Sequence, residues 1–217
     1  MDTIKLYSKP RTKAQAEAIA GSLGEPSKMP GYAYGISATH CQTGGKLAKV
    51  AGSVCYDCYA MKGHYLQTSV KKGHAKREAN LASPEWIDAM ILMIGRTGTE
   101  YFRWHDSGDL QSLGHLLAIV QVCEALPDVS FWLPTREKAI VRQYQRAIGA
   151  FPSNLVVRVS GAMVDGAAPA GFANVSVVVA TVGATGHECP APKQENKCMD
   201  CRACWQPSVH CVTYHKH

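Results

Sequence analysis

Residues 101–137 contain two strand patterns separated by a helix pattern: YFRWHDSGDLQSLGHLLAIVQVCEALPDVSFWLPTRE. Each strand pattern is apolar and ends in a short polar run, and the segment between them carries apolar residues at helical spacing from Leu113 to Cys123. Strands that alternate with helices at this interval are typical of β-α units in a parallel sheet. This stretch therefore predicts an α/β fold.

The same alternation extends outward in both directions. Strands are predicted over 99–109, 129–137, 154–163 and 174–186, the last two joined without a full helix. Helices are predicted over 12–23, 55–81, 83–98, 111–127 and 138–152, and an extended loop over 24–54. A complete eight-unit barrel needs about 250 residues, and this chain has 217. We therefore predict a single β/α domain over 1–217, an incomplete β/α barrel or parallel sheet of five or six strands with cysteine-rich loops.

The composition is that of an ordinary globular protein, with 46% hydrophobic and 18% charged residues. The longest apolar run, NVSVVVATVGA, is shorter than the roughly 18–20 residues that cross a membrane, and the N-terminal segment lacks the apolar stretch of a signal peptide. We therefore expect a cytoplasmic protein without a membrane partner. Secreted, membrane-spanning and fibrous classes are disfavoured.

Most of the nine cysteines lie in two predicted loops, an N-terminal one over 35–65 and a C-terminal one over 187–211. In a reducing compartment such clusters indicate metal or redox chemistry rather than disulfides. The C-terminal loop has the spacing C-x8-C-x2-C-x2-C, formed by Cys189, Cys198, Cys201 and Cys204. Four thiolates can complete a site for an iron–sulfur cluster or for zinc. The compact run favours a 4Fe–4S cluster, with zinc as the alternative.

The N-terminal loop carries only three cysteines at the spacing C-x13-C-x2-C: Cys41, Cys55 and Cys58. Three thiolates leave one iron of a 4Fe–4S cluster without a protein ligand, and that iron is open to a substrate or small molecule. Alternatively His40 or His64 closes the site, the set joins Cys211 or a C-terminal histidine, or these are ordinary core and surface cysteines.

We predict Cys123 to be a core residue. The terminal histidines are predicted to form a frayed polar tail: His210, His215 and His217.

Polar side chains follow the predicted strands, at the end of a parallel sheet where ligands bind. The candidates for catalysis are His105, Asp106, Asp109 and Arg136. Among them His105 or Asp106 is the candidate acid–base group. The candidates for binding a cofactor are Ser107, Thr135 and Ser160. The alternative is that Asp106, Ser107 and Asp109 only cap the following helix.

Positive charge is concentrated at the N-terminal side. Residues 1–80 carry a net charge of +7 and residues 81–217 a net charge of −1. A clustered positive field favours phosphate-bearing partners, so DNA or RNA is the candidate partner of the basic N-terminal third. Its basic run comprises Lys71, Lys72, Lys76 and Arg77, and the tyrosines that could stack on bases are Tyr32, Tyr34, Tyr56, Tyr59 and Tyr65. The alternative is a solvated basic face with tyrosines packed over the metal loop.

Four elements of the sequence together resemble the phage protein family called gene product 88. They are RWHDSGDLQS, FWLPTRE, the CYA that follows a C-x2-C pair, and CPA followed by C-x2-C-x2-CW, and the resemblance covers residues 35–205. It implies a protein of bacteriophages or related mobile elements that acts in the host-cell cytoplasm. It assigns no biochemical role.

The C-x13-C-x2-CYA element is also similar to phage proteins that resemble radical S-adenosylmethionine (SAM) enzymes with β/α barrels. This likeness implies that Cys41, Cys55 and Cys58 carry a cluster that binds SAM, and that the C-terminal cysteines hold an auxiliary cluster. The chain departs from the radical-SAM pattern in two respects. The usual C-x3-C-x2-C loop is stretched, and no GGE-type strand end follows, so the strand-end hydroxyls are the candidates to replace it.

Two functions are the leading hypotheses. The first is a radical-SAM-like 4Fe–4S enzyme that acts on nucleotides or nucleic acid through a cluster with an open iron. The second is a nucleic-acid-binding protein whose iron–sulfur or zinc sites are structural. A redox or interaction protein that acts on a host factor is a third, weaker hypothesis.

Overall fold

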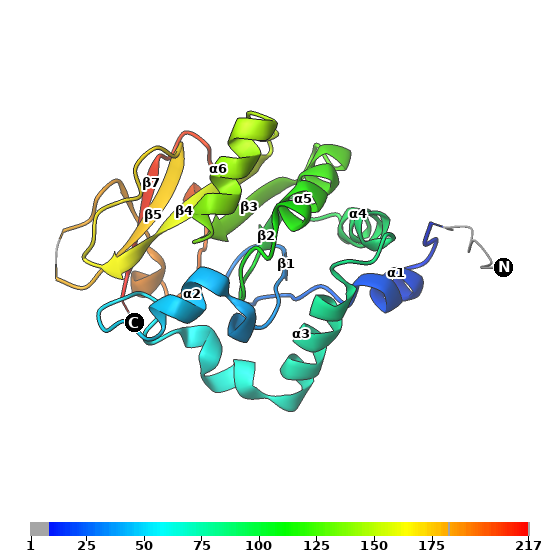
Figure 1. The fold of residues 1–217 in the computed structure, drawn as a ribbon, viewed down its shortest axis with the longest axis horizontal. Coiled ribbons are helices and arrows are strands. Elements are labelled where there is room, and N and C mark those ends of the chain that lie inside the picture. The colour runs from blue at the N-terminus through cyan, green and yellow to red at the C-terminus, as the bar shows by residue number, and fades with distance from the viewer. Residues whose placement is uncertain (1–8, 182, 217) are drawn as a thin grey trace.

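The computed structural model describes residues 9–181 and 183–216, and its centre is one seven-stranded sheet (Figure 1). The strands lie in the order β1-β2-β3-β4-β5-β7-β6, and every neighbouring pair is parallel. Their bounds are β1 Tyr32–Tyr34, β2 Tyr101–Trp104, β3 Ser130–Thr135, β4 Leu155–Val164, β5 Asn174–Val179, β6 His187–Glu188 and β7 Cys211–His215. The first five follow chain order, as in a β/α barrel, but the sheet is open. The prediction of an incomplete parallel α/β sheet is confirmed.

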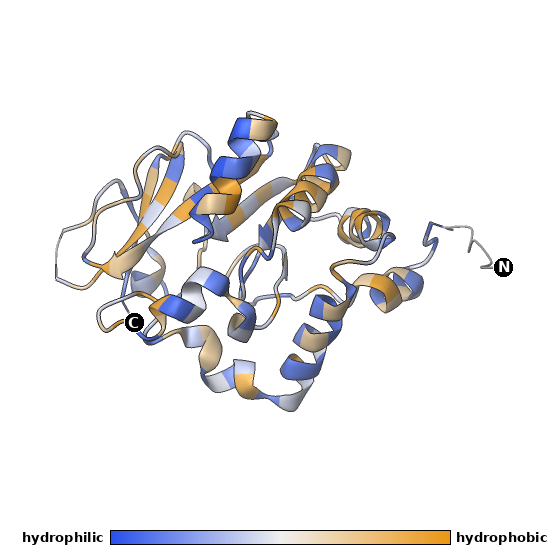
Figure 2. Ribbon diagram, in the orientation of Figure 1, coloured by the Kyte–Doolittle hydropathy of each residue, from blue (hydrophilic) through white to orange (hydrophobic). Residues whose placement is uncertain are grey.

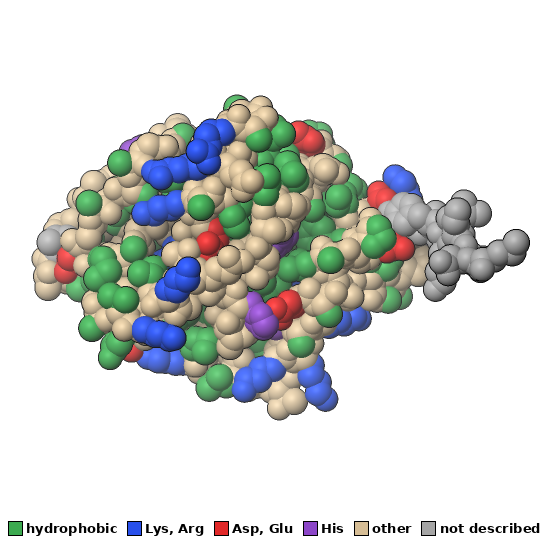
Figure 3. Space-filling model, viewed as in Figure 1, with side chains coloured by type: hydrophobic (Ala, Val, Ile, Leu, Met, Phe, Trp, Pro, Cys, Tyr) green, Lys and Arg blue, Asp and Glu red, His purple; other side chains and the backbone are tan. Residues whose placement is uncertain are grey.

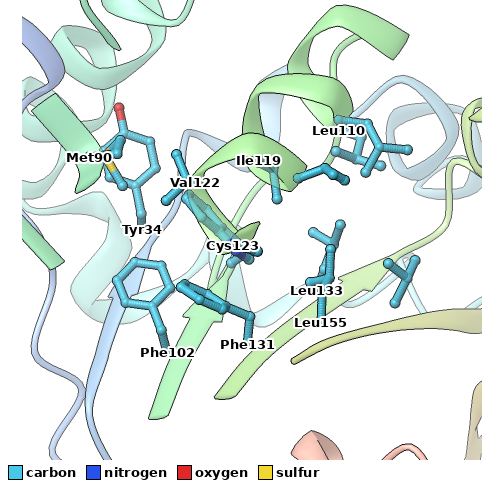
Figure 4. Close-up of a cluster of buried hydrophobic side chains, with 14 of the residues drawn as sticks. Tyr34, Met90, Phe102, Leu110, Ile119, Val122, Cys123, Phe131, Leu133 and Leu155 are labelled. Atoms are coloured by element: carbon cyan, nitrogen blue, oxygen red, sulfur yellow. The ribbon is translucent and has the colours of Figure 1, made fainter. Parts of the chain in front are cut away.

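Four helices share one hydrophobic core with one face of this sheet: α1 Lys13–Ala20, α4 Trp86–Thr97, α5 Leu113–Ala125 and α6 Lys138–Ala147 (Figure 1). Alternate strand residues point toward the helices, so Phe102, Phe131 and Leu133 are fully buried beside Ile119 of α5 (Figure 4). Figure 2 shows the corresponding hydrophobic colour on α4, α5 and the strands. Cys123 lies in this core, as predicted.

The opposite face of the sheet is covered by the C-terminal cysteine-rich segment. Trp205 donates its indole N–H to the Phe102 carbonyl at 3.0 Å, and its ring packs edge-on against Tyr101 and Trp132. The fully buried Arg158 of β4 points to the same side. Its guanidinium donates to five backbone carbonyls, those of Val175, Ala203, Gln206, Val209 and His210. The sheet is therefore covered on both faces, as is usual for parallel strands.

A long insertion between β1 and α4 reaches the carboxyl ends of the strands. It contains α2 Gln42–Leu47, α3 Thr68–Asn80 and short 3-10 turns at Ala38–His40, Tyr59–Met61 and Gly63–Leu66. The prediction of a helix over 55–81 is wrong in its first half, because the chain turns repeatedly there and Gly63 adopts a positive φ of 53°. The loop predicted over 24–54 likewise contains β1 and α2.

The sheet has more strands than the five or six that the sequence predicts. The segment predicted as a frayed tail forms β7, which lies between β5 and β6. Thr213 of β7 is fully buried, and His215 Nε2 lies 2.9 Å from Glu188 Oε1. The tail prediction is wrong because pairing with β5, and not a local apolar pattern, orders this segment.

No helix in the described ranges is long and apolar enough to cross a membrane. The domain predicted over 1–217 includes residues 1–8, which lie outside those ranges, and two further predicted features also extend beyond them. The strand predicted over 174–186 includes Val182, and the predicted tail includes His217, and neither residue is among those described. The described part of that strand ends at Val179.

Candidate functional site

A cavity of about 370 Å³ lies at the carboxyl ends of β2, β3 and β4, next to α2. All three cysteines of the N-terminal set are in its wall, although Cys41 precedes α2 and Cys55 and Cys58 follow it. Every strand-end candidate also lines it: His105, Asp106, Ser107, Asp109, Thr135, Arg136 and Ser160. The tertiary structure thus brings the N-terminal cysteine set together with all the catalytic and cofactor-binding candidates.

The side chains of Cys41 and Cys55 converge on Gly44 of α2. A Cβ at residue 44 would lie 3.6 Å from Cys41 Sγ and 3.5 Å from Cys55 Sγ, so both sulfurs border the same small space. Burial raises the pKa of Cys41 to about 12 and also raises the pKa of Cys55, while the positive charge of Arg136 opposes both shifts. Free thiols here keep their protons at neutral pH, so a bound metal would have to displace them.

The cavity wall contains the donor type of an iron–sulfur cluster, but no three His, Cys, Asp or Glu side chains in the described ranges form a group that could hold a metal ion. Cysteine thiolates are the protein ligands of such clusters, and three thiols face this one cavity. Gly44 leaves open the space that a side chain would fill between two of them. His105 adds two buried ring nitrogens in the same wall that have no hydrogen-bond partner in the described part of the chain. The wall thus combines three thiols with an imidazole that has no hydrogen-bond partner among the described residues.

His105 has the most unusual conformation in the cavity wall. It follows β2 directly and has a left-handed backbone with φ of 54°, which is rare for a residue with a side chain and is common at functional sites. Its ring packs edge-on against His115, with centroids 5.3 Å apart. Burial keeps the pKa of His105 well below its ordinary value. The ring is therefore neutral at pH 7, with one nitrogen as a hydrogen-bond donor and the other as an acceptor.

Arg136 and Asp106 face the cavity in different ways. The Nε of Arg136 is buried and has no hydrogen-bond partner among the described residues. It can donate to an anionic ligand. The Asp106 carboxylate accepts a hydrogen bond from the Tyr65 hydroxyl at 3.4 Å, and its backbone carbonyl accepts one from Tyr59 at 2.6 Å. Asp106 is thus held by tyrosines of the insertion.

Asp109 joins two strand ends instead of projecting freely into the cavity. Its carboxylate accepts hydrogen bonds from Thr135 Oγ1 at 2.5 Å and from the backbone N–H groups of Arg136 and Leu110, both at 2.8 Å. The helix-cap alternative does not apply to it, because the N-cap of α5 is Ser112. Asp109 therefore fixes the position of the loop that carries Arg136.

The three hydroxyl candidates have protein partners in the cavity wall. Ser107 Oγ donates to the Ile36 carbonyl at 2.8 Å, and Thr135 Oγ1 donates to Asp109. Ser160 Oγ accepts a hydrogen bond from Ser176 Oγ at 3.1 Å. These bonds keep the wall rigid, and a bound cofactor would share the hydroxyls with their protein partners.

Asp109 is expected to make the protein less stable as pH rises from about 4 to about 6. Burial raises the pKa of Asp109 from 3.8 to about 6, against the opposing hydrogen bonds. In that interval the folded chain binds a proton that the unfolded chain has released, so stability falls with rising pH, by up to about 3 kcal/mol. Urea unfolding at several pH values measures this slope, and Asp109→Asn should remove it.

The comparison of wild type with this variant isolates Asp109 from other buried groups. His115, whose pKa burial lowers to about 4, acts in the opposite direction and cancels in the difference. A stability difference between the two proteins that stays constant from pH 4 to 6 would contradict the raised pKa.

Glu137, which the sequence analysis missed, fastens the cysteine-bearing insertion to α6. Its buried carboxylate accepts hydrogen bonds from the Thr43 backbone N–H and the Thr43 hydroxyl, both at 2.8 Å. Thr43 lies on α2, between Cys41 and Gly44. The signal in the sequence is only that Glu137 is the last residue of the strand-end TRE, and its partner is 94 residues away.

Glu137→Ala is expected to lower the free energy of unfolding by about 1–3 kcal/mol, because it leaves the Thr43 donors without their acceptor. The loss is measured from the urea concentration at the midpoint of unfolding, provided that the slope m of the unfolding free energy against urea is unchanged. Combining it with Thr43→Val should give less than the sum of the single effects, since both changes remove one contact. Glu124→Ala on the exposed side of α5 is the control, with a change within about 0.5 kcal/mol. Fully additive losses would show that the contact contributes nothing.

The C-terminal cysteine set belongs to the segment that packs on the face of the sheet opposite the four helices. Its members are Cys189, Cys198, Cys201 and Cys204. Cys198 is near enough to Cys189 and Cys201 for their charges to interact, as Cys204 is to Cys189. Cys204 Sγ also lies 3.1 Å from the Tyr214 hydroxyl, and burial raises the pKa of Cys204 to about 12. These electrostatic interactions link some of the four thiols without placing them in one group. In residues 9–181 and 183–216, no three His, Cys, Asp or Glu side chains form a group that could hold a metal ion.

Arg103 of β2, a second residue that the sequence analysis missed, lies between the two cysteine sets. It lines the cavity, and its guanidinium lies 4.5 Å from the centre of the Trp132 ring. Its positive charge also opposes the raised pKa of Cys198 and Cys204. It belongs to the RWHDSGD motif, but its place between the sets depends on which face of the sheet it occupies.

A family pattern covers both cysteine sets and the strand-end motif. The family model described as Gene product 88 matches residues 5–216. The chain belongs to the gene product 88 family. The match confirms the family resemblance of the sequence and extends it to nearly the whole chain. No curated protein and no solved structure matches it. The chemistry of this gene product 88 protein must therefore be inferred from its own site.

Other candidate ligands of the gene product 88 chain lie away from the cavity. His40 Nδ1 lies 2.5 Å from Glu78 Oε1 of α3. His64 lies in a separate recess with Asp57. Cys211 is buried in the core on the helix side. Within the described ranges, these three residues are absent from the cavity wall that contains the N-terminal cysteine set.

The basic N-terminal third is only partly accessible in this gene product 88 protein. Tyr34 is fully buried and donates its hydroxyl to the Ala20 carbonyl at 2.6 Å. The Arg77 guanidinium donates to the carbonyls of Ser22 and Gly35. These two residues fasten the insertion and are not free to contact a nucleic acid. The three lysines of the run are exposed on α3: Lys71, Lys72 and Lys76.

Proposed function

We propose that this gene product 88 protein is an iron–sulfur enzyme that acts on a nucleotide or nucleic acid beside a 4Fe–4S cluster on Cys41, Cys55 and Cys58. The observation that supports it is the shared cavity wall, in which these thiols lie with His105 and Arg136 from two strand ends. In parallel β/α folds this end of the sheet is where substrates bind.

The residues of the cavity would have different roles. The three thiolates would hold the cluster, which when bound supplies electron transfer and an iron position without a protein thiolate. His105 would exchange a proton with the ligand through Nδ1 or Nε2, since both are unpartnered among the described residues. Arg136 would orient an anionic group and balance the negative charge of the thiolates.

SAM is the small molecule that the radical-SAM likeness suggests for this site. Its carboxylate and amino groups need polar partners in the cavity wall. Arg136 is the best-placed donor, because its Nε is unpartnered in the described ranges. The other candidate partners already bond to protein groups: Ser107, Thr135 and Ser160.

The C-terminal cysteine set would hold a second, auxiliary cluster, with zinc as the alternative. This part of the proposal rests on the C-x8-C-x2-C-x2-C spacing of its four thiols. A second candidate function, a nucleic-acid-binding protein with structural metal sites, is favoured by one observation. The same segment packs on the sheet through Trp205 and is bound by Arg158 of β4, as is expected of a segment with a structural role.

Anaerobic purification with iron, sulfide and zinc analysis tests the proposal. About eight irons and eight sulfides per chain, and an electron paramagnetic resonance signal of the reduced protein that shifts when SAM is added, are the expected results. About four irons per chain would indicate a single cluster, and the cysteine variants would then show which cysteine set holds it. A colourless protein with one or two zinc ions, and no cluster after anaerobic reconstitution, would overturn the enzyme proposal in favour of the binding protein.

A further inference from the structure

A row of positively charged side chains lies on the outer side of α6, and the guanidinium of one of them, Arg142, lies 5.2 Å from the centre of the Phe172 ring. Val141 and Tyr144 face the core, which leaves Lys138, Arg142 and Arg146 at four-residue intervals on the other side. The helix KAIVRQYQRA contains no acidic residue. Among residues 9–181 and 183–216, no carboxylate forms an ion pair with these three side chains.

The row continues onto the insertion. Lys46 on α2 and Lys49 just after it are exposed and likewise lack an ion pair in the described ranges. The bonds from Thr43 to Glu137 hold α2 against the start of α6, so the two groups of charges become one surface. Figure 3 shows groups of blue side chains over α6 and over α2 on the same face of the molecule, with a red side chain between the two helices. We call Lys46, Lys49, Lys138, Arg142 and Arg146 the α2–α6 basic band.

The band runs past the cavity. Gly44, Gly45 and Ala48 of the α2 segment line the cavity, and so does Arg136, two residues before α6. Tyr59 and Met61 are also part of the cavity lining, and about half of each side chain is exposed. The cavity mouth is thus bordered by positive charge and by an exposed aromatic ring.

We infer that single-stranded nucleic acid binds along the α2–α6 basic band, its phosphates on the band and one base directed toward Tyr59 and the cavity. Evenly spaced cations match a phosphate backbone, and an exposed tyrosine offers a stacking surface to any base. A base within a duplex would first have to leave its stack to reach the cavity. Delivery of a base to the cavity rests on the proposed function, whereas binding to the band does not.

This surface differs from the one that the sequence favours. Three of its five charges lie in the C-terminal part of the chain, outside the basic N-terminal third. The exposed lysines of α3 therefore provide a matched control, because a triple charge reversal there changes the net charge by the same amount. Its members are Lys71, Lys72 and Lys76.

Fluorescence anisotropy with a labelled oligothymidylate of about 20 nucleotides, at several salt concentrations, tests the inference. The triple variant K138E/R142E/R146E is expected to bind at least about tenfold more weakly and to reduce the slope of log K against log salt by about 2. The control K71E/K72E/K76E is expected to change affinity by less than about twofold. If charge reversal prevents folding, K138A/R142A/R146A replaces it, with a smaller loss in the same direction.

Four results would overturn the inference. They are no binding by wild type, equal weakening by both triple variants, weakening by the control alone, and equal or tighter binding of a duplex of the same length. Iron and sulfide content, measured in the same samples, should be unchanged in the band variant. A wild type that binds the oligonucleotide but takes up no cluster would remove the proposed function and leave the band. A protein that contains the cluster but binds no oligonucleotide would refute the inference about the α2–α6 basic band and leave the proposed iron–sulfur site.

Discussion

Cys55→Ala is expected to remove about half of the iron and sulfide of the purified protein, about four atoms of each per chain, while the chain stays folded. Cys55 lies in the insertion, apart from the helix-side core, so its loss leaves the main packing intact. The remaining cluster would be that of the C-terminal set. Metal and sulfide analysis, with circular dichroism of the same sample, measures both effects.

Two further cysteine variants make this result specific. Cys123→Ala removes a thiol from the core and is expected to keep all the iron while losing about 1–2 kcal/mol of stability. Cys201→Ala is expected to remove the other half of the iron and to destabilise the fold, because the proposed metal at that segment would stabilise the packing of the segment on one sheet face. Full iron content in Cys55→Ala would refute the assignment of the N-terminal set. Equal, severe unfolding of Cys55→Ala and Cys201→Ala would favour two structural sites.

Arg158→Met is expected to lower the free energy of unfolding by about 3 kcal/mol or more. The side chain is fully buried, and its guanidinium donates at 2.9 to 3.4 Å to five carbonyls. Methionine fills part of the volume but leaves several buried carbonyls without donors, and each orphaned group costs about 1–3 kcal/mol unless another donor or water reaches it. Four of these carbonyls belong to the segment 203–210.

The same substitution at an exposed arginine is the control for that loss. Arg146→Met on α6 is expected to change stability by less than about 0.5 kcal/mol. Urea unfolding of the two variants, at comparable m values, measures the change in the free energy of unfolding for each. A loss below about 1 kcal/mol for Arg158→Met would mean that the C-terminal segment is held by its other contacts, such as the indole bond of Trp205. Iron retained by the C-terminal cysteines should fall together with stability.

The central part of the fold follows from local sequence pattern. The strands β2 to β5 and the helices α5 and α6 are predicted at nearly their observed places, because each buries one face or stripe whose period is visible along the chain. The open parallel sheet follows from the same alternation and from the chain length. The two cysteine sets are also visible, since their spacing is itself the signal.

The ends of the sheet do not follow from local pattern. β1 has three residues and β7 has five, and the latter ends in polar histidine-containing sequence. β7 exists because its backbone groups pair with β5, more than 30 residues away in sequence, and because its inner side chains are buried there. Such pairing partners leave no periodic trace in the strand itself.

Burial in the folded chain determines which charged and aromatic residues are accessible to a binding partner. Arg77 and Tyr34 belong to the basic, tyrosine-rich part of the sequence, yet in the fold they fasten the insertion through hydrogen bonds. Arg142 and Arg146 lie in an unremarkable amphipathic helix, yet they join the α2–α6 basic band, because a bond between residues 43 and 137 sets α2 against α6.

The sequence by itself determined the α/β class, the β-α units from 101 to 179, the two cysteine sets and the polar strand ends. Only the tertiary structure placed Cys41, Cys55 and Cys58 in one cavity with His105, and the other cysteine set on the opposite face of the sheet. The physical reason is the range of the forces involved. Side-chain periodicity is fixed within a few residues, whereas neighbours across a sheet are chosen by backbone pairing and burial between distant segments.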